Sequence, residues 1–415
     1  MATLFISAPH FPPSAMPPSQ RVRLLVRHLH EFGWQPVVFS VSPTYREDVP
    51  DPWMLDITGD KFELIETGCL DPRKTRKFGI GDLGLRVFFY LFFSLLKNSR
   101  KKKPAAILYP VPPWYIMVMA PVVKWMTGIP YAIDFIDPWV YKVRKGDRKA
   151  AMSQWIAKRL EGFAVKRSSA IFAVSQGILD ELVDRHPSLA KIPRVAVPYG
   201  VEASDFLAIK TAEAKTPPVI LRYTGAISDA MLPVVATLFK ALKVVNAQVP
   251  LKVIFTGTSY AAADQVKPIL RELIEREGVS AFVTENPARV GYRQALEMSL
   301  SADMQLLIGD TTPYYAASKL MGLAVSGRPF FAFIHRHSFP ASFLTELNYR
   351  YKTDFETEEL STEGKVRELT DAILFAISEK DRFKGIDASH PVIAQHTATA
   401  MTKKFSDTLK QIAHV

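Results

Sequence analysis

The sequence has little cysteine and no long apolar segment, and both features exclude classes of protein. Cys69 is the only cysteine among 415 residues, which excludes a disulfide framework and a cysteine-based metal site and fits a reducing compartment. The longest strongly apolar run, residues 87–96, is about half the length that a membrane-spanning helix needs. The first residues lack the features of a signal peptide. With 48% hydrophobic and 22% charged residues, we expect a folded chain. Together these features place it in the cytoplasm, either free or peripheral at the inner face of the cell membrane.

The basic excess is confined to one half of the sequence. Residues 1–205 hold 28 basic and 19 acidic residues, a net charge of +9, whereas residues 206–415 hold 24 and 22. Residues 71–103 alone hold ten basic and two acidic residues. An anionic partner would therefore meet the first half of the chain.

Short apolar runs alternate with helix-length segments along the whole chain. This alternation predicts parallel sheets covered by helices on both faces. The expected strands are residues 3–7, 36–41, 105–109, 131–134, 170–174, 219–225, 251–257, 304–308 and 329–334. The pattern restarts after the double proline at 217–218, so we predict two doubly wound α/β domains joined near 200–217, and a final helix at 392–413. Ligands of such sheets gather at the carboxyl ends of the strands.

Six short motifs, in order, resemble the GT-B fold glycosyltransferases of the family-4-like kind, of the bacterial-envelope type. They are residues 7–13 (SAPHFPP), 134–139 (DFIDPW), 173–176 (AVSQ), 197–201 (VPYGV, followed by Phe206), 223–225 (YTG) and 317–329 (ASKLMGLAVSGRP). Each motif alone is weak, but together they fall in the same order over about residues 3–335, which is most of the chain.

The resemblance implies an architecture and an activity. It implies two Rossmann-like doubly wound domains facing a cleft, with an acceptor-binding domain at 1–205 and a nucleotide-sugar-binding domain at 206–391. The C-terminal helix, residues 392–415, would cross back onto the first domain. The expected reaction moves a sugar from a nucleotide diphosphate sugar to a lipid-linked or polysaccharide acceptor, with retention of configuration and without a metal or other cofactor.

The sequence departs from the family pattern at a paired set of glutamates, which lie eight residues apart in the family. Tyr314 and Gly322 stand at those two positions. The departure keeps an alternative open: a catalytically degenerate GT-B protein that acts as a binding or scaffold partner in glycan assembly. A GT-B sugar-nucleotide epimerase is a third possibility.

In the second domain, Lys319 matches the family lysine, and its cation would stabilise the negative charge that grows on the leaving diphosphate. Arg222 would substitute for the family arginine that is missing after Gly225, or it is a paired structural arginine. Gly225 would let the backbone approach a phosphate, and Gly257 follows the same pattern; both also suit a simple turn. Two further candidates are Ser318 and Tyr314. Ser318 would donate a hydrogen bond to a phosphate or cap its helix, and Tyr314 stands at the first glutamate position.

In the first domain, His10 follows the first strand, where it would bind acceptor or sugar unless it is structural. Asp137 follows another strand and would orient the acceptor hydroxyl or act as its base, although Asp-Pro is also a common turn. Asp134 is a weaker candidate for the same role. Arg21 and Arg23 would meet a charged acceptor or form a solvated helix face.

Residues 86–103 join an aromatic-rich apolar run to a basic end. A helix that rests on an anionic membrane surface would explain both features, and the basic cluster at 73–77 adds to them. An ordinary buried helix with a basic last turn is the alternative. We find no nucleic-acid-binding module in the sequence.

Overall fold

The computed structural model describes residues 1–48, 50–141, 148–207, 209, 217–259, 266–387 and 389–414, and these residues form two compact units. One unit comprises residues 1–46, 52–200 and 398–415, and the other residues 47–51 and 201–397. The chain therefore passes from the first unit to the second after Gly200, whereas the sequence analysis placed this boundary after residue 205.

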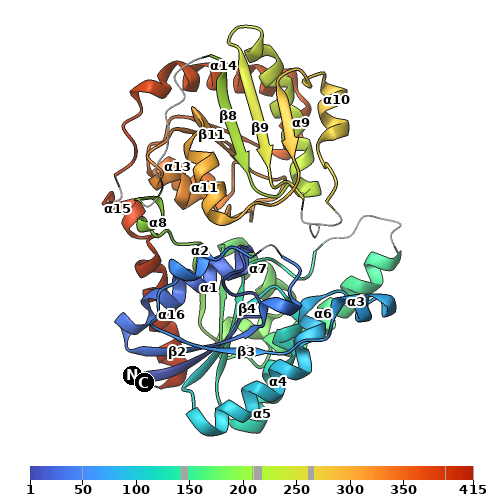
Figure 1. The fold of residues 1–415 in the computed structure, drawn as a ribbon, viewed down its shortest axis with the longest axis vertical. Coiled ribbons are helices and arrows are strands. Elements are labelled where there is room, and N and C mark those ends of the chain that lie inside the picture. The colour runs from blue at the N-terminus through green and yellow to red at the C-terminus, as the bar shows by residue number, and fades with distance from the viewer. Residues whose placement is uncertain are drawn as a thin grey trace. The chain divides into compact units, whose positions relative to one another are not determined.

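A parallel seven-stranded sheet forms the centre of the first unit, in the order β3-β2-β1-β4-β5-β6-β7 (Figure 1). Its strands are β1 (Ala2–Ser7), β2 (Trp34–Val41), β3 (Glu63–Thr67), β4 (Ala106–Val111), β5 (Tyr131–Phe135), β6 (Ala170–Ala173) and β7 (Arg194–Ala196). Its helices are α1 (Pro17–His28), α2 (Trp53–Asp56), α3 (Pro72–Thr75), α4 (Leu83–Lys102), α5 (Ala120–Thr127), α6 (Arg148–Val165), α7 (Gln176–Arg185) and α16 (Ala398–Ala413).

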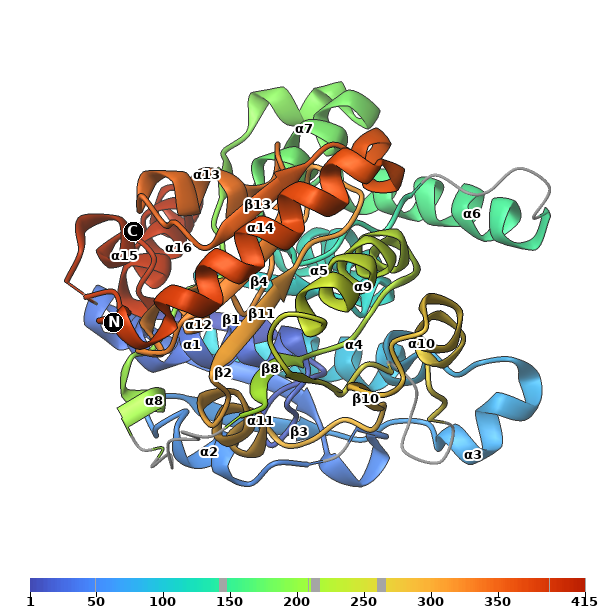
Figure 2. The ribbon, with the colours of Figure 1, turned by 90° about the horizontal axis from the view of Figure 1, so that it is seen from above.

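The second unit holds a parallel six-stranded sheet in the order β10-β9-β8-β11-β12-β13. Its strands are β8 (Val219–Thr224), β9 (Leu251–Thr256), β10 (Val283–Asn286), β11 (Met304–Ile308), β12 (Phe330–His335) and β13 (Lys352–Phe355). Its helices are α8 (Ser204–Leu207), α9 (Leu232–Asn246), α10 (Arg271–Glu277), α11 (Tyr292–Leu300), α12 (Leu320–Val325), α13 (Phe339–Glu346), α14 (Glu363–Glu379) and α15 (Pro391–Ala394). Helices α9 and α14 pack against each other in this unit (Figure 2). The predicted α/β fold with two parallel sheets is confirmed.

The last helix packs in the first unit, although it comes at the other end of the sequence. Phe405 of α16 contacts Phe172 of β6 with ring centroids 4.3 Å apart, and Trp34 Nε1 donates to Ser406 Oγ at 3.0 Å. Met401, Phe405 and Leu409 are spaced for one helix face and are buried in the same core as β1. The predicted single helix at 392–413 is two helices, because α15 ends at Ala394 and α16 begins at Ala398.

Helix α4 buries one stripe and exposes the opposite one. Val87, Leu91 and Leu95 recur every four residues and are fully buried, while Phe89 and Phe93 are 67% and 63% exposed. In the described part of the chain, no single helix is long and apolar enough to cross a membrane. The segments Pro72–Phe78 and Leu83–Lys102 pass that test only as a pair, and they are bent by 117°.

Candidate functional site

The strongest candidate site lies in the second unit, at the edge where its parallel strands end. Strands β8 and β9 are each followed directly by a glycine, Gly225 and Gly257, with φ of 144° and 74°. Their amides extend the sheet, since Gly225 N donates to Thr256 O at 2.9 Å and Gly257 N donates to Asn286 O at 2.8 Å. Backbone that only glycine adopts easily thus lines the edge where ligands of parallel sheets bind.

Lys319 reaches this edge from the loop that follows β11. Its Nζ donates to the carbonyl oxygen of Thr224 at 2.9 Å and lies 3.4 Å from the centroid of the Tyr223 ring. Burial lowers the pKa of the Lys319 ammonium to about 7. The side chain is therefore a cation held in place at the end of β8, and its environment disfavours the charge until an anion binds.

Gly225 and Lys319 depend on each other. A Cβ at position 225 would lie 2.8 Å from Lys319 Nζ, closer than real Cβ contacts. Together with the positive φ, this contact explains why residue 225 is glycine: the ammonium occupies the space of its missing side chain.

Ser318 and Tyr314 lie in the same loop as Lys319. Ser318 is exposed, and Lys319, not Ser318, is the N-cap of the six-residue helix α12, so the expected capping role of Ser318 is wrong. Tyr314 is half-buried. The predicted donor-binding residues Gly225, Ser318 and Lys319 thus gather at or beside one sheet edge, with Tyr314 on the loop that leads there.

Arg222 lies apart from this group. It precedes Tyr223 in β8, and consecutive strand residues point to opposite faces, so its side chain lies on the face opposite the one where Lys319 covers Tyr223. Burial lowers the pKa of its guanidinium, and its Nε has no hydrogen-bond partner among the described residues. Arg222 and Lys319 therefore approach the strand from different faces.

Gly322, at the position of the second family glutamate, has a packing reason. A Cβ at this position would lie 3.0 Å from Phe206 Cζ. The ring of Phe206 thus covers the spot from which a larger side chain would start. The glycine at position 322, where the family has a glutamate, is therefore matched by the packing of Phe206 against it.

Three polar residues at this edge were missed by the sequence analysis. Asp310 follows β11 and accepts hydrogen bonds from Thr312 N at 2.8 Å and Thr312 Oγ1 at 2.6 Å; burial raises its pKa. His335 ends β12, and burial lowers its pKa. Glu356 follows β13 and lies 2.9 Å from His337 Nε2. Asp310 and His335 stand at the ends of predicted strands, so the rule that selected Gly225 could also have found them, whereas Glu356 follows β13, which the sequence did not predict.

Arg289 is a fourth residue that was missed. Its Cα would lie 3.8 Å from a Cβ on Gly257, which places its loop directly beside the glycine that ends β9. The side chain is half-buried. Within the described ranges, no group of three His, Cys, Asp or Glu side chains is arranged to hold a metal ion.

In the first unit, His10 and Asp137 also follow strands. His10 is half-buried after β1, and Asp137 is exposed after β5, two strands away in the sheet. Next to Asp137, three aromatic rings pack together: the Trp114 and Trp139 rings stack with centroids 6.4 Å apart, and Tyr115 meets Trp139 edge-on at 5.2 Å. Trp114 Nε1 donates to Asp137 O at 3.3 Å and so ties the two loops together.

The expectations for Arg21, Arg23 and Asp134 are wrong. Arg21 and Arg23 are each only 1% exposed, so they form neither a solvated helix face nor an acceptor site. Arg21 donates two hydrogen bonds to Asp134, from Nε at 2.6 Å and from Nη2 at 2.8 Å. The Asp134 carboxylate is therefore occupied by a structural ion pair and is no base for an acceptor.

Tyr199, from the motif at residues 197–201, packs against the same ion pair. The Tyr199 ring lies 5.4 Å from the Arg21 guanidinium carbon, and the Phe405 ring lies 5.1 Å from it on α16. Tyr199 Oη also donates to Pro17 O at 3.2 Å. Tyr199 thus anchors the end of the first unit just before Gly200.

Residues 18–200 match the model of the glycosyl transferase 4-like domain. This stretch ends at the residue where the first unit ends. The predicted resemblance is confirmed over these residues, and with it the predicted class of enzyme, a glycosyltransferase.

Solved structures of the same fold cover the whole chain. Sucrose-phosphate synthase from Thermosynechococcus elongatus aligns with a TM-score of 0.66 at 13% identity, over 99% of each chain. HepE from Anabaena, in complex with UDP-glucose, aligns with a TM-score of 0.63 at 13% identity, over 99% of this chain and 100% of that one. A glycosyltransferase from Rickettsia africae aligns with a TM-score of 0.60 at 14% identity, over 99% and 98%. No curated protein matches the sequence. The two-sheet architecture described above is thus the GT-B fold.

Proposed function

We propose that this glycosyltransferase moves a sugar from a nucleotide diphosphate sugar to a lipid-linked or polysaccharide acceptor, and that the edge around Lys319 binds the diphosphate of the donor. The observation that carries the proposal is the cation held over Tyr223 beside Gly225. Support for the donor class comes from HepE, a protein of similar fold whose structures hold UDP and UDP-glucose.

Lys319 has the properties that this task requires. In the transfer, the bond between the anomeric carbon and the diphosphate oxygen breaks, and its electron pair leaves with the diphosphate. Lys319 Nζ, already held 2.9 Å from Thr224 O, needs no rearrangement to meet that growing negative charge. A bound diphosphate also restores the pKa of Lys319 toward its ordinary value, because it supplies the counter-charge that the free site lacks.

We assign the acceptor to the first unit. Asp137 is the exposed carboxylate that would orient the acceptor hydroxyl, or take its proton while the hydroxyl oxygen bonds to the anomeric carbon. The aromatic group of Trp114, Tyr115 and Trp139 beside it gives flat apolar surface of the kind that sugar rings stack on. His10 stays a candidate for the same acceptor. Retention of configuration and independence of metal are part of the proposal and come from the family resemblance.

The membrane contact is part of the same proposal. Residues 71–103 combine the exposed rings of Phe89, Tyr90 and Phe93 with a cationic last turn of α4, as a surface that rests on anionic lipid requires. A lipid-linked acceptor would lie in that surface, at the inner face of the membrane of the cell. Replacing Phe89 and Phe93 by alanine removes two exposed rings that add nothing to the core, so it should weaken binding to anionic vesicles without unfolding the chain.

The test of the proposed function is a transfer assay with purified protein, a panel of nucleotide sugars and a membrane extract as acceptor source. We expect incorporation of one sugar, loss of turnover in Lys319→Ala, and loss of turnover with unchanged donor affinity in Asp137→Asn. Unchanged turnover in Lys319→Ala would overturn the assignment of that lysine. The second candidate function is a donor-binding scaffold, which is favoured because Tyr314 and Gly322 stand where the family has carboxylates. A protein that binds the donor but neither hydrolyses it nor transfers its sugar would establish this function.

A further inference from the structure

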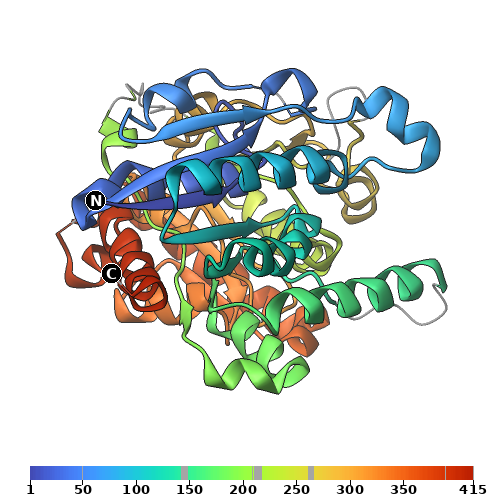
Figure 3. The ribbon, with the colours of Figure 1, turned by 90° about the horizontal axis from the view of Figure 1, so that it is seen from below.

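Helices α4, α5 and α6 cover the same face of the first sheet. They connect β3 to β4, β4 to β5, and β5 to β6, and each connection runs in the same direction across the sheet, from the β3 edge toward the β7 edge. Because such connections are right-handed, all three helices lie on one face of the sheet. Helix α4 contacts α5, and α5 contacts α6. Figure 3 shows the three helices side by side. Their outward sides therefore form one continuous surface.

Helix α5 turns a large apolar stripe to the outside. Val122, Trp125 and Met126 are spaced by three and four residues, the separation of neighbours on one helix face. Trp125 is 84% exposed, and both Val122 and Met126 are exposed as well. None of these side chains contributes to the core, so the sheet does not account for them.

Helix α6 continues the pattern in its first half. Met152, Trp155 and Ile156 are exposed, and the first buried residue of the described part of the helix is Ala157. The guanidinium carbon of Arg159 lies 4.9 Å from the Trp155 ring centroid, so a cation accompanies the exposed indole. In this half of α6, Gln154 accepts from Tyr141 N at 2.9 Å and donates to Trp139 O at 3.4 Å, while the side chains of Met152, Trp155 and Ile156 stay exposed.

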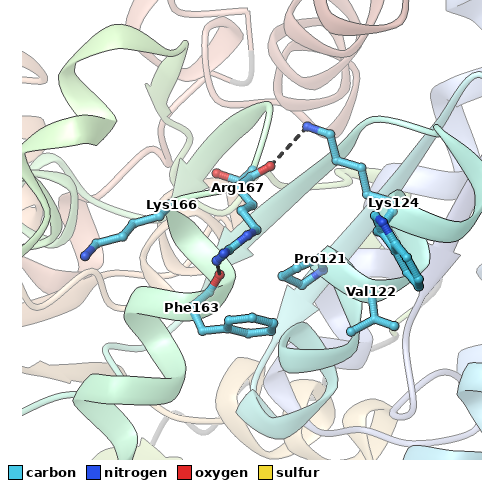
Figure 4. A pocket seen from close by; sticks show the side chains of 8 residues that line it. Pro121, Val122, Lys124, Phe163, Lys166 and Arg167 are labelled. Atoms are coloured by element: carbon cyan, nitrogen blue, oxygen red, sulfur yellow. Dashed lines mark hydrogen bonds between the residues drawn. The ribbon is translucent and has the colours of Figure 1, made fainter.

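Between α5 and the end of α6 lies a groove of about 610 Å³, shown in Figure 4. Pro121, Val122 and Phe163 supply apolar lining, and Trp125 and Ser168 complete it together with three cations, Lys124, Lys166 and Arg167. The lining holds no acidic residue. Arg167 Nη1 donates to Phe163 O at 3.4 Å and Lys124 Nζ donates to Arg167 O at 3.1 Å, while Lys166 extends away from the other labelled side chains (Figure 4).

We propose that the outer face of α5 and α6, including this groove, binds an anionic phospholipid bilayer. The chemistry fits that occupant in two respects. Tryptophan side chains prefer the boundary between headgroups and acyl chains, where their apolar body and polar N–H are both accommodated. Lysine and arginine at the rim meet lipid phosphates there, each contributing about 1 kcal/mol near an anionic surface.

A soluble protein partner fits less well, because protein interfaces are depleted in lysine while this groove presents two lysines beside one arginine. The contact also has a geometric consequence. The helix α4 surface and the α5–α6 surface are adjacent, so binding through both would fix the orientation of the first unit on the bilayer, whereas a single helix would leave it free to roll.

The proposal is independent of sugar transfer and of the contact at residues 71–103, and the test keeps both intact. Flotation of the full chain is measured with vesicles of phosphatidylcholine alone and of phosphatidylcholine mixed with phosphatidylglycerol. One variant is Lys166→Gln/Arg167→Gln and the other is Trp125→Ala/Trp155→Ala; all four side chains are exposed. The matched controls lie in the second unit: Lys267→Gln/Arg271→Gln for the charges and Leu207→Ala, whose side chain is 86% exposed, for the apolar surface.

We expect the charge variant to lose about 25-fold in affinity for the anionic vesicles, fivefold for each cation removed. The tryptophan variant should lose roughly tenfold or more. In addition, the tryptophan emission of the intact chain should shift to the blue on the anionic vesicles and be quenched by brominated lipid, less so in Trp125→Phe. Both controls should bind like the intact chain.

The proposal would be overturned if the charge variant and the tryptophan variant both bound the vesicles as tightly as the intact chain. If Phe89→Ala/Phe93→Ala abolishes binding while both α5–α6 variants bind like the intact chain, only the α4 contact stands, and this inference falls. Self-association that disappears in the tryptophan variant while vesicle binding persists would also overturn it, in favour of a contact between copies of the chain. Far-UV circular dichroism of each variant establishes that it is folded.

Discussion

A side chain at residue 225 and the ammonium of Lys319 cannot occupy their places together, since a Cβ there would lie 2.8 Å from Lys319 Nζ. We therefore expect Gly225→Ala to displace the lysine and weaken donor binding. The positive φ of 144° adds a backbone cost of about 1–3 kcal/mol in the free energy of unfolding. Urea unfolding and donor titration measure the two effects.

Gly278 offers a matched control for that substitution. It also has a positive φ, of 66°, and a Cβ there would meet a lysine ammonium, Lys243 Nζ, at 3.2 Å. Gly278→Ala should therefore lower stability while leaving donor affinity unchanged. Equal losses of donor affinity in Gly225→Ala and Gly278→Ala would mean that the effect is general destabilisation.

Donor binding should depend on pH through Lys319. The pKa of this lysine in the free protein is about 7, so below that pH the ammonium is charged and ready for a diphosphate. As the pH rises above 7 the free protein loses the proton and must take it up again on binding, so the affinity should fall by up to about tenfold per pH unit. A nucleotide sugar is the right probe, because its phosphate diesters lose no proton between about pH 6 and pH 9, whereas a terminal phosphate titrates near pH 6.

Calorimetry in buffers of different ionisation enthalpy measures this proton uptake directly. We expect close to one proton bound per donor at about pH 8, and none in Lys319→Ala. A pH-independent affinity in the intact protein would show that Lys319 does not carry the interaction. Burial lowers the pKa of His335 from its ordinary value, so this imidazole is neutral at about pH 8 and takes up no proton there.

The ion pair of Arg21 and Asp134 should dominate the stability of the first unit. Asp134→Ala leaves a buried guanidinium without its counter-charge and should cost about 3–5 kcal/mol in the free energy of unfolding. Arg21→Met/Asp134→Leu, which removes both charges, should recover most of the loss. The exposed pair of Lys403 and Asp407 is the control, and Asp407→Ala should cost less than about 1 kcal/mol. Equal urea midpoints for Asp134→Ala and the intact protein would contradict this account.

The sequence predicted the central strands of both sheets but missed β3, β7, β10 and β13. These four strands are the edges of the two sheets. Central strands of a parallel sheet are buried on both faces and stand out as apolar runs, whereas the edges keep polar residues that are only half-buried, such as Lys352 and Asp354 of β13. The fold could therefore be predicted from the central strands, whereas the edge strands of both sheets could not be predicted.

The sequence predicted those site residues that a local motif marks, and it missed the contacts that form only when distant segments pack together. Lys319 and Gly225 were found because a motif and a strand end mark them. The ring of Phe206 over Gly322 and the burial of Arg21 against Asp134 join residues more than 100 positions apart, and no local pattern signals such contacts. The same holds for Arg289, whose loop approaches Gly257 only in the folded unit.

The most direct test is a calorimetric panel of UDP, GDP, dTDP and ADP with their common sugars, against the intact protein and Lys319→Ala. The account predicts micromolar binding of one nucleotide sugar below about pH 7, weakened about 10–100-fold in the variant, as expected for the loss of a charge-assisted contact. Equal affinity in the two proteins, or no binding across the panel, would contradict it.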